Sequence, residues 1–326
     1  MLRGVSTGKD ERLLVGPDSF DDAGIVELRG VEGLPADTNV ALVQTVDYFP
    51  PVVDDPYFYG AIAAANSLSD VYAMGGKPLS ALNLAGIPKD FPPEWTAAIF
   101  KGGFDKMREA NCVVAGGHTV ASKEALFGFA VTGIVDRRRV AANSGAKPGD
   151  RLYLTKSLGM GTMTTAGKRQ KISWQQLEPA AKQMATLNDR AAEAMNASGA
   201  HAATDITGFG LVGHAKNIAA ASGVTLRLEL GKAPLFPGVL ELARAGFCSG
   251  GAKRGRTGLA ADVSIAAGLD DALVNLAFDA ETSGGLLICV PAANAAKLER
   301  ELAARNQLVC ALGEVLPRGE RWIELV

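Results

Sequence analysis

The sequence predicts an α+β protein of two domains, and three observations lead to this prediction. The chain has 326 residues, about twice the length of an ordinary single domain. Both halves mix β-rich runs with helical patterns and show no short-period internal repeat. A polar stretch with glycine and proline follows Val135, which is typical of a connection between domains. We therefore expect an N-terminal domain over 1–140 and a C-terminal domain over 141–326.

The first domain is expected to alternate strands with helices. Residues 39–49 are β-rich and alternate polar with apolar side chains, which predicts a strand, whereas 57–74 and 94–110 have the period of amphipathic helices. Two apolar, β-branched runs at 112–119 and 126–135 predict further strands. A Gly-Gly-His sequence ends the first of these runs, so we expect a loop there.

The second domain repeats this style along the rest of the chain. One long amphipathic pattern predicts a single helix over 174–197, and glycines interrupt the next helical pattern at 207–221. Further helices are expected at 237–245, 269–277 and 292–305, and strands at 151–155, 224–230, 308–316 and 322–326.

Composition and charge exclude several classes of protein. With 33 Lys plus Arg against 35 Asp plus Glu, the chain has no basic excess to neutralise a nucleic-acid backbone. It contains no run of 18 apolar residues and no apolar leader pattern. The cysteines are widely spaced and form no C-x-x-C motif, which is typical of free thiols in a reducing compartment. They are Cys112, Cys248, Cys289 and Cys310. We expect a cytoplasmic protein that binds neither nucleic acid nor a membrane.

Glycine is unusually frequent, with 38 residues, about 12% against roughly 7% in average proteins. Glycine-rich turns at 115–119, 156–162 and 279–285 are candidates for phosphate contacts through backbone N–H groups. None matches a P-loop or a dinucleotide fingerprint, and each also fits an ordinary tight turn. Among the histidines, we expect His118 in the first turn to be functional and the other two to be structural.

The helix expected at 57–74 is apolar almost all round, yet it carries Asn66 and Asp70. Four residues apart, these two side chains share one helix face. A buried carboxylate requires a cation or several hydrogen-bond donors, because an unpaired buried charge is very costly. A cation site and a structural pairing with a core arginine or a neighbouring cap both fit Asp70 at this point.

Other carboxylates stand in similar apolar or glycine-flanked settings. Asp21 and Asp22 precede a strand-like run, Asp47 ends one, and Asp205 lies at a predicted junction between a loop and a helix. Mg²⁺ takes oxygen ligands and bridges carboxylates to phosphates. We therefore expect these residues to converge with Asp70 around a metal and a phosphate. Asp21 also fits a turn or N-cap residue.

Motifs along nearly the whole chain resemble the selenophosphate synthetase (selenide, water dikinase) family, part of the aminoimidazole ribonucleotide synthetase-like superfamily. The motifs that carry this resemblance are LLVG (13–16), DDAG (21–24), TVDYFPPVVDDP (45–56), AANSLSDVYAMGGKP (64–78), AGGH (115–118), TDITGFGLVGH (204–214) and TSGGL (282–286). Their number and length make a chance match negligible.

The resemblance implies ATP-dependent conversion of selenide to selenophosphate with release of AMP and orthophosphate. It implies a Mg²⁺ requirement, commonly with K⁺, and a two-domain fold of mixed and antiparallel sheets flanked by helices. In this fold the N-terminal domain binds ATP and metal and forms a homodimer, for which we expect strands 39–49 and 126–135 to provide open edges. By motif, the metal ligands are Asp22, Asp70 and Asp205, and the nucleotide contacts are Asp21, Asp47, Asp70, Gly117, His118 and Thr119.

One departure from the family pattern concerns the N-terminus. The family's glycine-rich loop, with its Cys or selenocysteine and a following Lys, has no counterpart from Met1 onward. We expect this loop to be encoded upstream of Met1, and the present chain to bind Mg-ATP but to make little selenophosphate. Two alternatives stay open: another ATP-using enzyme of the superfamily, such as thiamine monophosphate kinase, and a nucleotide-binding paralogue without catalysis.

Overall fold

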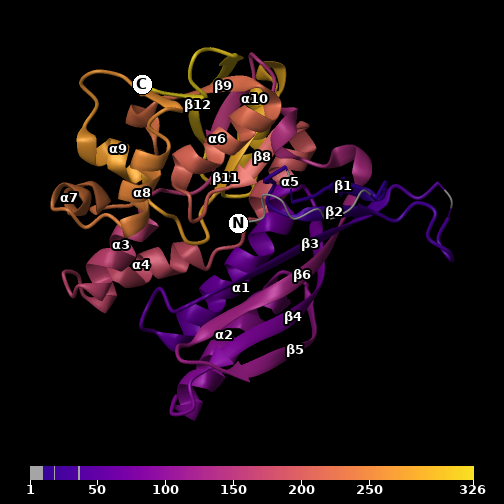
Figure 1. The fold of residues 1–326 in the computed structure, drawn as a ribbon, viewed down its shortest axis with the longest axis vertical. Helices are drawn as coiled ribbons and strands as arrows, with labels where there is room; N and C mark the ends of the chain where they lie inside the picture. Colours follow the sequence, from indigo (N-terminus) through magenta and orange to yellow (C-terminus); the bar gives the residue numbers. More distant parts are fainter. Residues whose placement is uncertain (1–9, 18, 36) are drawn as a thin grey trace.

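The chain forms two sheets flanked by helices in a computed structural model that describes residues 10–17, 19–35 and 37–326. Figure 1 places the N-terminal sheet with α1 and α2 in the lower part of the view and the C-terminal elements in the upper part. The predicted α+β class with mixed and antiparallel sheets is confirmed. None of the helices in the described residues is long and apolar enough to cross a membrane.

The N-terminal sheet has six strands in the order β1-β2-β3-β6-β4-β5. All neighbouring strands in it are antiparallel except β4 and β5. Its elements are β1 (Leu13–Val15), β2 (Gly24–Glu27), β3 (Val40–Phe49), α1 (Pro56–Ala73), β4 (Lys77–Ile87), α2 (Pro93–Glu109), β5 (Val113–Ala121) and β6 (Leu126–Asp136).

The C-terminal sheet has seven strands in the order β10-β13-β9-β12-β7-β11-β8, and β13 is parallel to both of its neighbours. Its strands are β7 (Arg151–Leu154), β8 (Ala202–Asp205), β9 (Val224–Leu228), β10 (Val263–Ile265), β11 (Leu286–Val290), β12 (Cys310–Pro317) and β13 (Ile323–Leu325). Its helices are α3 (Met160–Lys168), α4 (Trp174–Met184), α5 (Asp189–Ser198), α6 (Gly210–Ser222), α7 (Val239–Arg244), α8 (Gly250–Gly258), α9 (Asp271–Phe278) and α10 (Ala295–Ala304).

Helix α1 is the element that joins the two halves. It begins after Asp55, whose side chain accepts a hydrogen bond from the Phe58 amide, with Pro56 at the first helical position. One side of α1 packs on β3 and β6, and the rest contacts α2, α4, α5 and β8. Because neighbours surround it, nearly every residue is buried, which explains an apolar pattern without a polar face.

The structure corrects three expectations about elements. The helix predicted over 174–197 is two helices, because Asn188 in the break turns its amide inward to Ser69 Oγ (2.8 Å) and the Gly284 carbonyl (2.9 Å). The loop predicted at Gly-Gly-His is wrong, since β5 continues through it with a bulge beside β4. Strands β3 and β6 are interior strands paired on both sides, so the predicted open edges are wrong as well.

Candidate functional site

Three carboxylates from distant parts of the sequence meet where the two halves of the chain face each other. Asp22 stands just before β2, Asp70 lies on α1, and Asp205 is the last residue of β8. Each offers a carboxylate oxygen, and these oxygens lie within 4.8 Å of one another. The structure therefore brings together the three residues that the motifs predicted as metal ligands.

The packing of α1 on β3 positions Asp70 and adds Asp47 to the group. Thr45 Oγ1 donates to Asp70 Oδ2 (2.5 Å), and Asn66 Nδ2 donates to Asp47 Oδ2 (2.9 Å). Thr45 and Asp47 alternate to the same face of β3, and Asn66 and Asp70 share one face of α1. Two side chains four residues apart on α1 therefore face two side chains two residues apart on β3.

Asp22 and Asp205 carry the oxygens that lack partners. Thr204 Oγ1 donates to Asp22 Oδ1 (2.8 Å). Asp22 Oδ2 and Asp205 Oδ2 are buried, and neither has a hydrogen-bond partner among the described residues. Within the same residues, no lysine or arginine forms an ion pair with the members of this carboxylate cluster, Asp22, Asp47, Asp70 and Asp205. The structural alternative for Asp70, pairing with a core arginine, does not apply.

Electrostatics in the cluster favour a bound cation. Burial raises the pKa of Asp47 to about 7 and that of Asp205 to about 6. Burial, followed by repulsion from Asp205, holds the pKa of Asp22 and of Asp70 well above the ordinary range. Carboxylates this close repel one another when ionised, and a divalent cation between them relieves both the repulsion and the burial cost. The all-oxygen donor set with orphaned buried oxygens fits a hard ion such as Mg²⁺.

Lys156 is a cation beside the cluster that the sequence did not single out. It is buried after β7, where its Nζ donates to the carbonyls of Thr186 (2.7 Å) and Ser283 (2.9 Å). Burial lowers the pKa of Lys156 to about 7, although the charge of Asp205 acts in the opposite direction. The only available signal was its place at the start of a glycine-rich turn, where the glycines drew attention instead.

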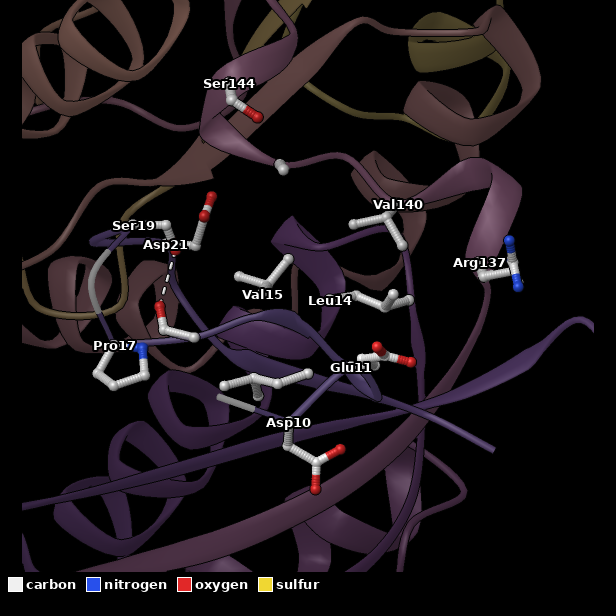
Figure 2. Close-up of a pocket in the computed structure, with 13 residues that line it drawn as sticks. Asp10, Glu11, Leu14, Val15, Pro17, Ser19, Asp21, Arg137, Val140 and Ser144 are labelled. Carbon is white, nitrogen blue, oxygen red and sulfur yellow. Dashed lines mark hydrogen bonds between the residues drawn. The ribbon is translucent and has the colours of Figure 1, made fainter. Parts of the chain in front are cut away.

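Asp21 lies outside the cluster, on the wall of a separate pocket of about 750 Å³. Figure 2 shows its carboxylate among Val15, Ser19 and Ser144. Asp21 Oδ1 accepts a hydrogen bond from the Asn143 amide (2.6 Å) in the connection between the two sheets. This long-range contact is structural, but it is not the local turn or N-cap contact expected from the sequence.

Gly117, His118 and Thr119 lie on β5, away from the carboxylates. In the sheet register, Asp47 pairs with Phe129 on β6, Phe129 pairs with Asn83 on β4, and Asn83 pairs with Gly117 on β5. Three strand steps place Gly117 about 14 Å from Asp47 along the sheet. His118 alternates to the other face of the sheet, the face that α1 and α2 leave open. Within a single chain, His118 therefore does not contact the carboxylates of Asp22, Asp47, Asp70 and Asp205.

The remaining glycine-rich turns, 156–162 and 279–285, pack against each other. The Gly159 and Met160 amides donate to Glu281, and Thr162 Oγ1 donates to Asp279. The Glu281 carboxylate thus accepts hydrogen bonds from the backbone N–H groups at the start of α3. The Ser283 and Gly284 N–H groups also have partners within the chain. For phosphate contacts through these backbone N–H groups, the structure therefore favours the tight-turn alternative.

His214 and His201 make structural contacts. His214 is buried, its Nε2 accepts from the Thr207 amide (3.1 Å), and burial lowers its pKa to about 4. His201 Nδ1 lies 2.9 Å from Asp150 Oδ2.

Two family models match the chain. The AIR synthase related protein N-terminal domain matches residues 20–135, and the C-terminal domain of the same family matches 147–323. Selenide, water dikinase of Clostridioides difficile is 39% identical over 317 residues, covering 97% of this chain and 89% of the relative. The protein of the same name from Geobacter metallireducens is 45% identical over 314 residues, covering 96% and 89%.

Solved structures share the fold at lower identity. The crystal structure of tt0281 from Thermus thermophilus has a TM-score of 0.70 at 20% identity and covers 94% of this chain and 88% of that one. The structure of AaThiL complexed with AMPPCP and TMP has a TM-score of 0.68 at 21% identity, with coverages of 94% and 87%. At these identities the likeness establishes the fold alone.

Proposed function

This chain belongs to the AIR synthase-related proteins and, within them, to the selenide, water dikinase family, and we propose that it phosphorylates selenide to selenophosphate with ATP, releasing AMP and orthophosphate. The observation that carries the proposal is the carboxylate cluster. Four buried or half-buried carboxylates, none of them in an ion pair with a described lysine or arginine, form a site that suits a metal-bound polyphosphate.

We assign the metal-holding role to Asp22, Asp70 and Asp205. Mg²⁺ bound there would offset the charge of the phosphates, and K⁺ is proposed as a second cation. The chain's own contribution is to hold the oxygens in place: Thr45 fixes Asp70 and Thr204 fixes Asp22. Phosphoryl transfer asks mainly for such positioning and charge neutralisation.

Asp47 is proposed to contact the nucleotide together with the metals. Asn66 orients the Asp47 carboxylate through a hydrogen bond. Asp47 lies two residues after Thr45 on the same face of β3, and therefore at the side of the cluster. Asp21 is proposed only at the edge of the site, since its carboxylate is bound to the connection between the sheets.

The open face of the N-terminal sheet supports a homodimer. Val46 and Tyr48 are each 55% exposed and Leu82 is 50% exposed, and all three alternate to the face opposite α1. Apolar side chains gathered on one open sheet face mark an interaction surface. We therefore propose that a second copy covers this face, in place of the strand edges expected from the sequence.

His118 belongs to the same face, because register places it in one row with Leu84, Gly128 and Tyr48. We propose that His118 contacts the nucleotide across the dimer interface. Gly117 and Thr119 alternate to the opposite face of β5, and they are proposed as nucleotide contacts only from their place in the motif.

Light scattering tests the dimer. The chain is 33.8 kDa, so we expect about twice this mass, and Leu82→Lys should yield monomer because it buries a charge in the interface. Leu308→Lys, at an exposed apolar position in the C-terminal half, should leave the mass unchanged. A monomeric wild type would contradict the proposal.

The activity is tested by anaerobic incubation with Mg-ATP and selenide, followed by ³¹P NMR. We expect AMP, orthophosphate and selenophosphate to form slowly and only when selenide is present, and Asp70→Asn to abolish them. A parallel incubation replaces selenide with thiamine monophosphate. Formation of ADP and thiamine diphosphate, with no response to selenide, would instead favour the related kinase activity.

A further inference from the structure

Ser283 lies in the turn between α9 and β11 in a backbone conformation that serine rarely adopts. Its φ is 51°, in the left-handed region, which costs free energy for a residue with a side chain. The turn is held on both sides, since a Cβ on Gly284 would lie 2.2 Å from the Ile206 carbonyl oxygen and one on Gly285 would lie 2.4 Å from the Lys156 amide nitrogen. The surrounding packing therefore imposes the conformation of Ser283.

The backbone of Ser283 is bonded into the carboxylate cluster. Its N–H donates to Asn66 Oδ1 (3.0 Å), and the amide group of Asn66 in turn donates to Asp47. Its carbonyl accepts from Lys156 Nζ (2.9 Å). Ser283 is thus two hydrogen bonds from Asp47. Its partner Asn66 shares one face of α1 with Asp70, which lies one turn further along the helix.

The side chain of Ser283, by contrast, has no partner. The residue is 1% exposed, and its Oγ is buried without a hydrogen bond to any described residue. Asp22 Oδ2 and Asp205 Oδ2 share this condition. The turn lies next to Asp205 in the fold, because the Gly284 N–H donates to the carbonyl of Ile206, the residue after Asp205. A buried hydroxyl without a partner lowers stability, and glycine would suit both the backbone and the packing of this turn better.

We propose that Ser283 Oγ is a ligand-binding group, and that it donates a hydrogen bond to an anionic or metal-bound oxygen when the Mg-nucleotide occupies the cluster. This inference rests on the proposed function and extends the site to a residue on the C-terminal turn. The bound ligand would then supply the hydrogen-bond partner that no described residue supplies to this hydroxyl. Two oxygens have this chemistry: a phosphate oxygen of the nucleotide and a water bound to the metal.

Calorimetric titration of Ser283→Ala with a non-hydrolysable ATP analogue in Mg²⁺ tests the proposal. We expect affinity to fall about 10-fold, the effect of one hydrogen bond to a charged group. The melting temperature of the ligand-free variant should stay the same or rise, because an unpaired polar atom has been removed. Ser283→Gly should lose the same affinity, which protects the test against a folding defect in the alanine variant.

Gln170→Ala is the matched control. Gln170 also has a left-handed backbone, with φ at 55°, but it is exposed and lies at the end of the α3 segment. Its replacement should leave affinity for the analogue unchanged. Separate titrations with Mg²⁺ alone and with Mg²⁺ plus orthophosphate identify the oxygen: weaker Mg²⁺ binding in Ser283→Ala indicates a metal-bound water, and a defect confined to the phosphate ligands indicates a phosphate oxygen.

Two results would overturn the inference. Wild-type affinity in both Ser283 variants would show that the hydroxyl contacts no ligand. A lower melting temperature of the ligand-free variants with unchanged affinity would assign Ser283 a purely structural role. If the wild-type chain binds no analogue in Mg²⁺, the proposed function itself fails and this inference falls with it.

Discussion

Two groups of buried carboxylates in this molecule differ in what surrounds them. The carboxylate cluster of Asp22, Asp47, Asp70 and Asp205 lies where the two halves of the chain meet. The second group, Asp279 and Glu281, lies inside the C-terminal half, in the turn that precedes β11. Burial raises the pKa of carboxyl groups in both, to about 7 for Asp47 and to about 8 for Glu281.

The second group has donors for its oxygens. Glu281 accepts from the Gly159 amide (2.6 Å) and the Met160 amide (3.0 Å) through its two separate oxygens. Asp279 accepts from Thr162 Oγ1 (2.7 Å) and the Ser249 amide (3.0 Å). In this group every carboxylate oxygen contributes to the packing of α3 and α8 against the turn.

The cluster lacks such donors for two of its buried oxygens, and its members repel one another. Burial and a raised pKa therefore do not by themselves separate a ligand site from a structural contact. The number of buried oxygens without a hydrogen-bond partner does separate a ligand site from a structural contact, because in a structural contact nearly all buried polar atoms are hydrogen-bonded.

The largest expected difference between the two groups is in the response to ligand. Mg²⁺ with a non-hydrolysable ATP analogue at about 100 times its dissociation constant should stabilise the wild type by about 2.7 kcal/mol. Asp205→Asn should lose this stabilisation, since one of the orphaned carboxylates becomes a neutral amide. Glu281→Gln should keep it. Differential scanning calorimetry measures all three, and an equal response in the two variants would remove the distinction.

The metal-free variants should also differ in stability, and in opposite directions. At pH 5, Asp22→Asn should raise the free energy of unfolding by about 1–2 kcal/mol. The raised pKa of Asp22 makes the wild type take up a proton on folding at this pH, at about 1.4 kcal/mol per pH unit above the ordinary 3.8, and the amide avoids this cost. Glu281→Gln should lower it by about 1–2 kcal/mol, because the amide NH₂ cannot accept from the second backbone N–H. Urea unfolding in EDTA measures both, and a stability loss in Asp22→Asn would show that Asp22 is a structural residue.

A pH series gives a third difference, one whose size per pH unit is smaller than the effects above. The pKa of Glu281 is about 8 in the fold against an ordinary 4.5, so its contribution to stability is complete below pH 4.5 and is lost as the pH rises through 8. The advantage of wild type over Glu281→Gln should therefore shrink as the pH rises from 5 towards 8, by at most about 1.4 kcal/mol per unit, and should reverse once this loss exceeds it. Mg²⁺ should not alter this trend, because backbone amides already occupy the Glu281 oxygens. A gap that does not change with pH would contradict this account.

The sequence predicted the members of the cluster better than their surroundings. Asp70 stood out because a charge on an all-apolar helix needs a partner, and the i, i+4 spacing to Asn66 indicated the shared face. Lys156 and Ser283 could not be found in this way. Their importance comes from a turn that reaches the cluster only after β7, β8 and β11 have paired.

Strand order limited the other predictions. The runs at 39–49 and 126–135 were recognised as strands, but their neighbours come from β2 and β4, and β4 was not recognised at all. Gly-Gly-His was assigned to a loop because adjacent glycines favour turns, whereas pairing with β4 keeps it extended. Local patterns specify such elements, and long-range pairing decides where they lie.

The central claim is that the carboxylate cluster holds the metal and the phosphates of ATP. Titration calorimetry of ATP into the wild-type chain and Asp70→Asn, each in Mg²⁺ and in EDTA, tests it most directly. The account predicts binding by the wild type in Mg²⁺ only, and affinity reduced at least about 100-fold in Asp70→Asn, because a metal-bridging carboxylate is lost. Undiminished ATP affinity in Asp70→Asn, or in the wild type with EDTA, would contradict the claim.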